Sequence, residues 1–262
     1  MSASITCVGL GMKLGAHISP ICKSHIEQAD VVFCAASDSL FELWVKEMNL
    51  DVRSLQSYYA EGKSRYDTYK QMVEAIMTEV RAGKKVVAAF YGHPCVFARV
   101  AGDVIEVAEQ ENFPAQIEAG ISAEDCLYAD LRIDPGKFGC QHFETSQLMF
   151  YQRIIDPAGY LILWQLAVAG DRKLTRYATG KAYRQLLLER LYQHYPPDHQ
   201  VILYEAAVLP IDNVRKEVIP LQQLPNATVT QATTLVIPPA ISMVKDEMMM
   251  KKLAELDKTA LE

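Results

Sequence analysis

The sequence predicts an α/β protein built from two α/β domains, and three observations support this class. Half of the 262 residues are apolar, which suffices for large buried cores. The first half of the chain alternates strand and helix patterns, whereas the second half is dominated by strand patterns. We expect a first domain over residues 1–140, a second over 141–240 and a helical or frayed tail over 241–262.

The first domain is expected to contain a mostly parallel sheet. Strand patterns cover residues 5–10, 31–36, 84–91 and 115–120, and helix patterns cover residues 19–29, 39–48, 67–83, 103–113 and 123–131. Ser19 followed by Pro20 is a typical helix start, and Gly83 suits a helix end. Such alternation indicates parallel strands with helices on both faces of the sheet.

The second domain is expected to contain a mixed or antiparallel sheet. Strand patterns cover residues 142–150, 160–170, 199–207, 216–224 and 233–239, and one long helix pattern covers residues 183–195. The tail has helical spacing and charges of both signs. It is expected either to pack on a partner or to fray.

Composition excludes several classes of function. No apolar run approaches the roughly 18–20 residues that span a bilayer, and the N-terminus lacks a secretory signal pattern. The net charge of −6 disfavours a general nucleic-acid binder. The six cysteines are scattered without a CxxC pair, so we expect reduced core thiols in a cytoplasmic protein and no metal site.

Three glycine-containing loops follow predicted strands, in the stretches VGLGMKLG, FYGHPCVF and AGISAEDCL. The first loop does not have the GxGxxG spacing of a dinucleotide fold. In the third loop, Ser122 is a candidate helix cap, and Glu124 and Asp125 follow it in the first turn. Because acidic residues at a helix start disfavour a bound phosphate, an NAD- or ATP-binding function is disfavoured.

The stretch YYAEGKSRYDTY places four tyrosines around Arg65. Arg65 and Tyr69 are four residues apart at a helix start, so they share one helix face. A structural interpretation is that Tyr69 lies at the edge of the core and that Arg65 is solvated or paired with Asp67. The alternative is a site that moves protons.

Several motifs resemble the tetrapyrrole methylase class of S-adenosylmethionine-dependent methyltransferases: VGLG, YGHPCVF, AGISAEDCL and TTLVIPP. More narrowly, the chain resembles the split type of borosin peptide α-N-methyltransferases. The resemblance implies that S-adenosylmethionine lies in the cleft between the two domains. The implied cofactor-binding residues are Gly11, Tyr91, His93, Val96, Phe97, Ser122, Ala123, Gln165, Ala206, Ala207 and Thr234.

The resemblance also assigns a role to the tyrosine stretch. The family's catalytic pattern matches Tyr59, Arg65 and Tyr69, and the implied substrate contacts are Tyr58, Tyr66 and Tyr91. His93 is expected to bond backbone rather than to act as a base.

Methylation of an amide nitrogen explains the need for these residue types. The nitrogen lone pair is delocalised into the carbonyl, so the proton must be removed or charge must be held on the oxygen. A tyrosine hydroxyl with a pKa of about 10 suits this task, and a guanidinium is expected to lower that pKa. The sequence leaves open whether Tyr59 or Tyr69 takes the proton.

The resemblance to split borosins implies a separate precursor peptide as substrate and partner. It further implies a homodimer that binds two precursor chains, as a heterotetramer. One rival hypothesis is a methyltransferase for a tetrapyrrole or another small molecule on the same fold, although a polycarboxylate substrate would need several arginines at the cleft. Another is a sensor that binds S-adenosylmethionine without catalysis.

Overall fold

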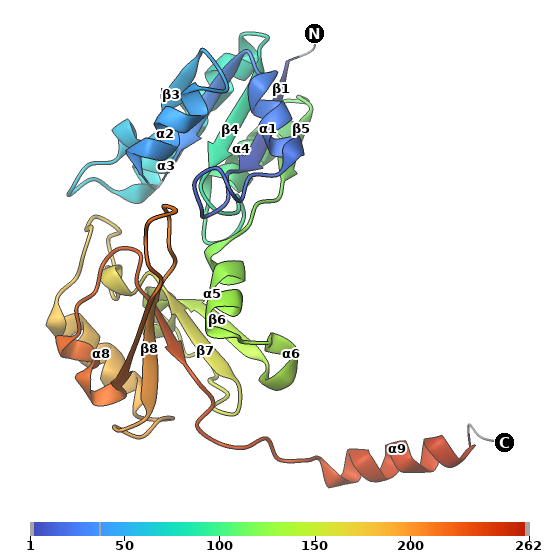
Figure 1. The fold of residues 1–262 in the computed structure, drawn as a ribbon, viewed down its shortest axis with the longest axis vertical. Helices are drawn as coiled ribbons and strands as arrows, with labels where there is room; N and C mark the ends of the chain where they lie inside the picture. The colour runs from blue at the N-terminus through green and yellow to red at the C-terminus, as the bar shows by residue number, and fades with distance from the viewer. Residues whose placement is uncertain (1–2, 37, 260–262) are drawn as a thin grey trace.

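A computed structural model describes residues 3–36 and 38–259 of the chain. The chain folds into two lobes, each centred on a five-stranded sheet, and the lobes lie one above the other in Figure 1. The α/β class with two sheets is therefore confirmed. The domain boundaries given above stay a prediction.

All strands of the first sheet are parallel, in the order β3-β2-β4-β1-β5. The strands are β1 (Ser4–Gly9), β2 (Val31–Ala35), β3 (Val52–Ser54), β4 (Lys85–Phe90) and β5 (Ala115–Glu118). The helices of this lobe are α1 (Pro20–Glu27), α2 (Ser39–Lys46), α3 (Arg65–Arg81) and α4 (Val100–Gln110). Helix α5 (Ala123–Leu131) follows β5 but packs Leu127 against the second sheet. The three-residue edge strand β3 was not predicted, because so short a segment carries no alternation to recognise.

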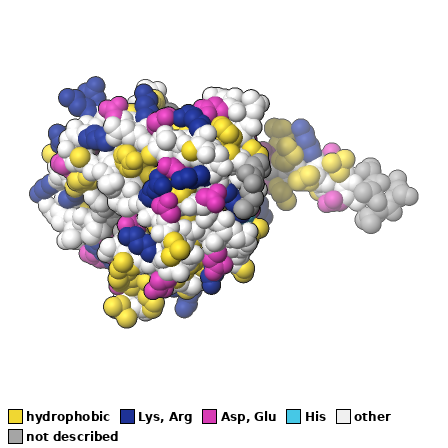
Figure 2. All heavy atoms as spheres, turned by 90° about the horizontal axis from the view of Figure 1, so that it is seen from above, with side chains coloured by type: hydrophobic (Ala, Val, Ile, Leu, Met, Phe, Trp, Pro, Cys, Tyr) yellow, Lys and Arg dark blue, Asp and Glu magenta, His cyan; other side chains and the backbone are white. Residues whose placement is uncertain are grey.

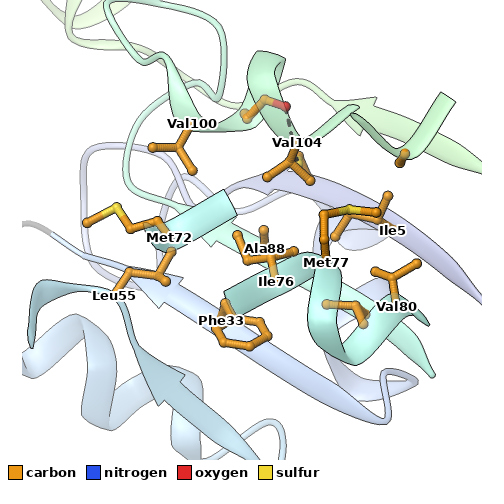
Figure 3. Close-up of a cluster of buried hydrophobic side chains, with 14 of the residues drawn as sticks. Ile5, Phe33, Leu55, Met72, Ile76, Met77, Val80, Ala88, Val100 and Val104 are labelled. Atoms are coloured by element: carbon orange, nitrogen blue, oxygen red, sulfur yellow. Dashed lines mark hydrogen bonds between the residues drawn. The ribbon is translucent and has the colours of Figure 1, made fainter. Parts of the chain in front are cut away.

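Helices cover both faces of the first sheet. On one face α3 buries Met72, Ile76 and Val80 against strand residues such as Ile5 and Phe33, as Figure 3 shows. On the other face α1 and α2 complete a second core cluster. Near-continuous apolar strands such as β4 follow from burial on both faces.

The second sheet is mixed, in the order β6-β7-β10-β8-β9, and only the β6–β7 pair is parallel. Its strands are β6 (Cys140–Glu144), β7 (Tyr160–Trp164), β8 (Gln200–Glu205), β9 (Arg215–Pro220) and β10 (Thr234–Ile237). The helical segments of this half are α6 (Pro135–Phe138), α7 (Thr145–Phe150), η2 (Leu166–Val168), α8 (Lys181–Leu191) and η3 (Leu221–Asn226). The main core of this lobe gathers apolar residues of α8, η3 and four strands.

Three predicted strands of the second lobe are too long. The segment 142–150 turns helical at Thr145, whose hydroxyl donates to the Trp164 carbonyl at 2.6 Å. The segment 160–170 leaves the sheet at Gln165, which has a left-handed φ of 58°. The segment 216–224 leaves it at Pro220, which has no N–H to continue a ladder.

Backbone hydrogen bonds join the two lobes. Leu14 N donates to Val208 O at 3.0 Å, so the β8–β9 hairpin reaches the loop that follows β1. A second set of bonds joins residues 62–65 to residues 174–176 and is described with the site below. The lobes are thus fastened to one another at two separate places.

The tail contains α9 (Glu247–Thr259), which projects away from both lobes in Figure 1. Side chains from residue 241 to 258 are exposed. Among the described residues, no helix combines the length and the apolar character needed to cross a bilayer. The face shown in Figure 2 carries acidic and basic side chains interspersed rather than one broad patch of either sign.

The cysteine prediction is right for four of the six residues. Cys7, Cys22, Cys34 and Cys126 are buried, and all six are free thiols. Cys95 is exposed, because it lies in the turn after β4 rather than in a strand.

Candidate functional site

Three glycines bring the loops after β1, β4 and β5 into direct contact. A Cβ atom on Gly9 would lie 2.5 Å from Gly120 Cα, and one on Gly120 would lie 2.3 Å from Gly92 O. Gly11 pairs with Gly92 in an isolated bridge and has a positive φ of 74°. These carboxyl ends of parallel strands are where α/β folds place ligands.

The tyrosine-arginine segment lies next to this edge. The chain passes through η1 (Gln56–Tyr58) and enters α3 at Arg65, with the Ser64 hydroxyl accepting from Tyr66 N. The rings of Tyr59 and Tyr69 meet edge to face with centroids 6.4 Å apart. Both rings also pack on the core of the first lobe. The ring of Tyr69 therefore lies at the edge of the core, as the structural interpretation of the sequence expected. This position does not decide the role of its hydroxyl.

A loop of the second lobe docks on this segment. Arg65 N donates to Leu174 O at 3.0 Å, and Gly62 N donates to Thr175 O at 3.0 Å. Arg65 Nη2 donates to Arg176 O at 3.1 Å. Tyr59, Arg65 and this loop line a small hollow between the lobes. Arg65 thus faces the opposite lobe rather than open solvent.

Burial dominates the electrostatics of the tyrosines. The pKa of Tyr59 is raised by burial and, to a lesser extent, by Tyr69 and Tyr91, and Arg65 only partly opposes this shift. The Arg65 guanidinium lowers the pKa of Tyr59, as expected, but burial outweighs this effect and the net shift is upward. Tyr59 is therefore a protonated hydroxyl at neutral pH and is suited to donate a hydrogen bond.

Tyr91 belongs to the same electrostatic group. Burial raises its pKa, Tyr69 adds to the shift and Arg65 opposes it. Its side chain is still 48% exposed. Protein atoms thus surround the Tyr91 hydroxyl, while part of the side chain still reaches solvent. Two predicted substrate residues, Tyr58 and Tyr66, are not among the groups that shift Tyr59.

Those two tyrosines have other contacts. Tyr58 packs on the core of the first lobe, and its carbonyl accepts from Lys63 Nζ at 2.6 Å. Tyr66 is 50% exposed, and the Arg99 guanidinium lies 5.1 Å from its ring centroid. The structure thus brings Tyr59, Tyr69 and Tyr91 together and leaves Tyr66 at the surface.

The predicted cofactor residues of the first half of the chain lie after β1 (Gly11), after β4 and after β5. His93 Nδ1 accepts from Cys95 N at 3.0 Å, which confirms the expected backbone bond. Val96 precedes Phe97, which has a left-handed φ of 50° and a ring centroid 5.1 Å from that of Trp164 in the second lobe. The Phe97–Trp164 contact thus joins the two lobes through their side chains.

Ser122 and Ala123 start α5 with a reciprocal capping arrangement. The Ser122 hydroxyl accepts from Asp125 N at 3.2 Å, and the Asp125 carboxylate accepts from Ser122 N at 2.7 Å. Two N–H groups at the helix start, those of Ser122 and Asp125, are thus satisfied by its own side chains, and the first turn carries negative charge. It suits a cofactor without phosphate groups, such as S-adenosylmethionine, better than a nucleotide phosphate.

The predicted cofactor residues of the second lobe follow or begin its strands. Ala206 and Ala207 directly follow β8, and buried Thr234 begins β10 beside it. Gln165 was expected in mid-strand, but it follows the end of β7. A pocket of about 350 Å³ lies beside this set and is lined by Lys13, His17, Ile121, Asp125, Cys126, Ala129, Asp130, Ala206 and Ala207.

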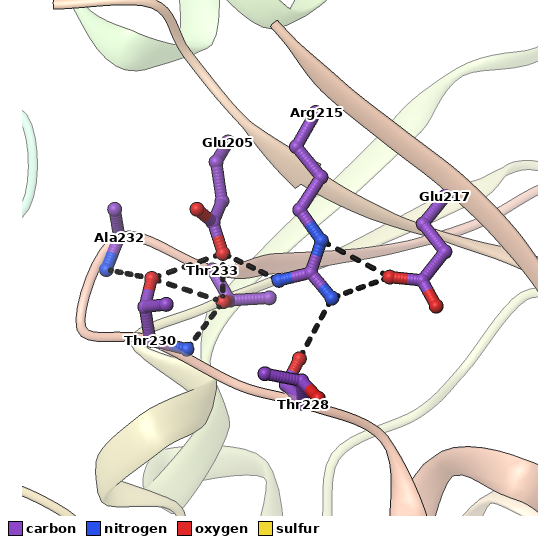
Figure 4. Close-up of polar contacts among 7 residues, drawn as sticks. All are labelled: Glu205, Arg215, Glu217, Thr228, Thr230, Ala232 and Thr233. Atoms are coloured by element: carbon purple, nitrogen blue, oxygen red, sulfur yellow. Dashed lines mark hydrogen bonds and ion pairs between the residues drawn. The ribbon is translucent and has the colours of Figure 1, made fainter.

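A polar network, shown in Figure 4, fastens the strand ends that carry Ala206 and Thr234. Glu205 Oε1 accepts from Thr233 Oγ1 at 2.5 Å, from Arg215 Nη1 at 2.6 Å and from Thr230 Oγ1 at 2.9 Å. Burial by itself would raise the pKa of Glu205, but these three donors outweigh it, so the pKa lies below its usual value. Sequence inspection missed this network because its members are far apart along the chain.

Sequence inspection also missed a hydrogen-bonded group that contacts Phe97 through Trp164. Trp164 Nε1 donates to His142 Nδ1 at 3.1 Å, and His142 Nε2 lies 2.8 Å from the Tyr128 hydroxyl. Burial lowers the pKa of His142, although Glu124 opposes this shift. A neutral His142 with Nδ1 as acceptor fits both contacts and holds the Trp164 indole in place.

Comparisons with known proteins agree with this architecture. The profile of the family described as Tetrapyrrole (Corrin/Porphyrin) Methylases matches residues 4–223. The solved structure of uroporphyrin-III-C-methyltransferase from Thermus thermophilus superposes with a TM-score of 0.64. That likeness covers 95% of this chain and 100% of the other, at 16% sequence identity, and so concerns the fold alone.

Two curated fungal proteins are more similar in sequence. The gymnopeptides precursor/methyltransferase of Gymnopus fusipes is 38% identical over 242 residues, which cover 91% of this chain and 58% of that protein. The type I borosin precursor/methyltransferase of Coprinopsis marcescibilis is 36% identical over 225 residues, which cover 85% and 58%. This chain therefore spans little more than half the length of both relatives.

The names of these relatives correct one expectation. Each is a methyltransferase and a ribosomally synthesised peptide precursor on one chain. The expectation of a separate precursor protein, as in split borosins, is therefore wrong, whereas the homodimer stays a prediction. It rested on where this sequence ends, which carries no information about the substrate.

Proposed function

Because this chain belongs to the tetrapyrrole (corrin/porphyrin) methylase family, we propose that it transfers methyl groups from S-adenosylmethionine to backbone amides of a ribosomally made peptide. The peptide class comes from the two fungal relatives, whose names join a methyltransferase to such a precursor. One observation carries the proposal. Tyr59, Arg65 and Tyr69 converge at the inter-lobe cleft, with Arg65 bonded across it to Arg176 O.

The proposed cofactor site comprises the loops after β1, β4, β5, β7 and β8 and the start of β10, with the residues described above. When bound, S-adenosylmethionine supplies an electrophilic methyl group on a sulfonium, which becomes a neutral thioether on transfer. Phe97 and Trp164 provide an aromatic wall, and Ser122 and Thr234 provide buried hydroxyl groups. This lining suits a cation that loses its charge during the reaction.

The protein's own part is to make the amide nitrogen nucleophilic. We assign Tyr69 Oη as the acceptor of the amide proton as the N–H bond breaks and the N–CH₃ bond forms. In this step Tyr69 acts as a phenolate, whose negative charge faces the Arg65 guanidinium one helical turn earlier on α3, and it becomes a neutral phenol on taking the proton.

The carbonyl oxygen of the same amide also gains charge during this step. Tyr59, which stays protonated, donates a hydrogen bond to that oxygen, and the Arg65 guanidinium supplies fixed positive charge. Tyr59 and Tyr69 thus have different roles, which the sequence left open. The difference follows from the burial that raises the pKa of Tyr59.

The test is to join the precursor region of the Gymnopus fusipes relative after residue 262 and to add S-adenosylmethionine with a trideuterated methyl group. Tandem mass spectra then assign each heavy methyl to a backbone nitrogen or to a side chain. We expect backbone methylation within the precursor region. Methyl groups confined to side chains, or none on any peptide while a uroporphyrinogen is methylated, would overturn the proposal.

A further inference from the structure

The loop between η2 and α8 is organised by one buried carboxylate, Asp171, which is 5% exposed. Asp171 Oδ2 accepts from Thr175 N at 2.8 Å and from Arg176 N at 2.9 Å. Oδ1 accepts from Lys173 N at 3.2 Å. Three backbone N–H groups thus converge on one side chain and fold the loop around it.

This arrangement turns the loop's carbonyl groups outward. Leu174, with a left-handed φ of 53°, reverses the chain direction between the residues whose N–H groups Asp171 holds. The carbonyls of Leu174, Thr175 and Arg176 then accept from Arg65 N, Gly62 N and Arg65 Nη2 of the other lobe. Three consecutive carbonyls therefore grip the start of α3, and two of them hold Arg65.

We infer that Asp171 is a positioning residue for Arg65: it fixes the 171–176 loop, whose carbonyls hold the guanidinium against the tyrosine pair. The inference rests on the proposed function for its catalytic consequence, but its structural part stands on the contacts alone. Asp171 lies in the second lobe and has no contact with Tyr59 or Tyr69 among its hydrogen bonds in the described residues.

A carboxylate is required here because every group around it is a donor. Ionised aspartate offers two oxygens that only accept, which matches three N–H donors. Asparagine has the same size but presents an NH₂ group to at least one of those N–H groups. Asp171→Asn therefore leaves one of these N–H groups without its acceptor and loosens the loop.

The first measurement is hydrogen exchange of the backbone amides in full-length protein without cofactor. In Asp171→Asn we expect faster exchange at residues 62–65 and 173–176, and unchanged exchange elsewhere in α3. Asp134→Asn is the matched control, since Asp134 Oδ1 accepts from Gly136 N at 2.8 Å in an exposed turn at α6, outside these contacts. Unchanged exchange at residues 62–65 in Asp171→Asn overturns the inference, whether or not the protein methylates peptides.

The second measurement separates positioning from folding. In the precursor fusion, Asp171→Asn is expected to lower kcat about 10–100-fold, while the Kd for S-adenosylmethionine stays within about twofold. If Asp171→Asn fails to fold, Leu174→Gly replaces it, because glycine relieves the positive φ yet frees the loop. An equal loss of cofactor binding in either variant contradicts a role directed at Arg65. A wild-type fusion without activity counts against the proposed function only.

Discussion

Two carboxylates, Asp171 and Glu205, differ in the groups that donate hydrogen bonds to them. Asp171 is buried and accepts only from backbone N–H groups, so it fixes main-chain carbonyls that grip Arg65. Glu205 is partly exposed and accepts from side chains of Thr230, Thr233 and Arg215. The first arrangement serves the proposed proton-handling side of the cleft, and the second serves the proposed cofactor side. Substitutions on the proton-handling side should therefore lower kcat, and substitutions on the cofactor side should raise the Kd for S-adenosylmethionine.

The largest effect is expected on the proton-handling side. Tyr69→Phe removes the oxygen that takes the amide proton, so kcat should fall roughly 10²–10⁴-fold. The Kd for S-adenosylmethionine, measured by isothermal titration calorimetry, should be unchanged because the ring still packs on the core. Tyr66→Phe is the matched control, since Tyr66 is exposed and lies outside the tyrosine group. Loss of cofactor binding together with turnover would break the separation between the two sides.

The next largest effect is a loss of folding stability when the hydrophobic core of either lobe is truncated. Ile76→Ala in the first lobe and Leu163→Ala in the second each leave a cavity among fully buried side chains. Each substitution should lower the free energy of unfolding by about 2–5 kcal/mol, measured by urea denaturation followed by circular dichroism. A loss below about 1 kcal/mol in only one lobe would show that this lobe packs loosely and holds its side of the cleft less firmly.

A smaller effect is expected on the cofactor side. Glu205→Gln removes the charge that holds Arg215 and two threonines, so the strand ends with Ala206 and Thr234 loosen. The Kd for S-adenosylmethionine should rise about tenfold, with kcat at saturating cofactor little changed. Glu217→Gln is the control, because Glu217 binds the other edge of Arg215 and none of the threonines. Equal effects of the two variants would show that the arginine, not Glu205, organises the network.

The smallest effect is a pH dependence of stability. Because the folded pKa of Glu205 lies below its ordinary value of 4.5, its ion contributes stability above that value. The contribution is lost as the pH falls through the folded pKa. Wild type should exceed Glu205→Gln by roughly 2–4 °C in Tm at pH 7, and the gap should close in acid. A gap that widens as the pH falls below 4.5 would contradict the assigned direction of the shift.

The first lobe was largely predictable from sequence, and the second was not. Helix α3 and strand β4 follow from periodicity, since α3 buries one face and β4 is covered on both. In the second lobe, an apolar run such as residues 142–150 does not reveal that Thr145 ends the strand by bonding to Trp164. Short apolar runs fit strand and helix equally well until tertiary contacts decide.

The candidate site was predictable only through its family resemblance. Tyr59, Arg65 and Tyr69 were singled out because their spacing matches a known pattern, and their role stays a proposal. The direction of the Tyr59 pKa shift depends on burial, which spacing does not encode. Asp171 was missed because DRKLTR reads as an ordinary polar loop. Its role becomes visible only when residues more than a hundred positions apart are seen to bond.

The fastening between the lobes is made mostly from main-chain atoms. Leu14 N to Val208 O, Gly62 N to Thr175 O and Arg65 N to Leu174 O all join backbone to backbone. Mutation of most side chains in these segments leaves such bonds in place. The distance between the lobes therefore depends little on which side chains line the proposed peptide site. Substitutions in the proposed peptide site can therefore accumulate while the relative placement of the two lobes is kept.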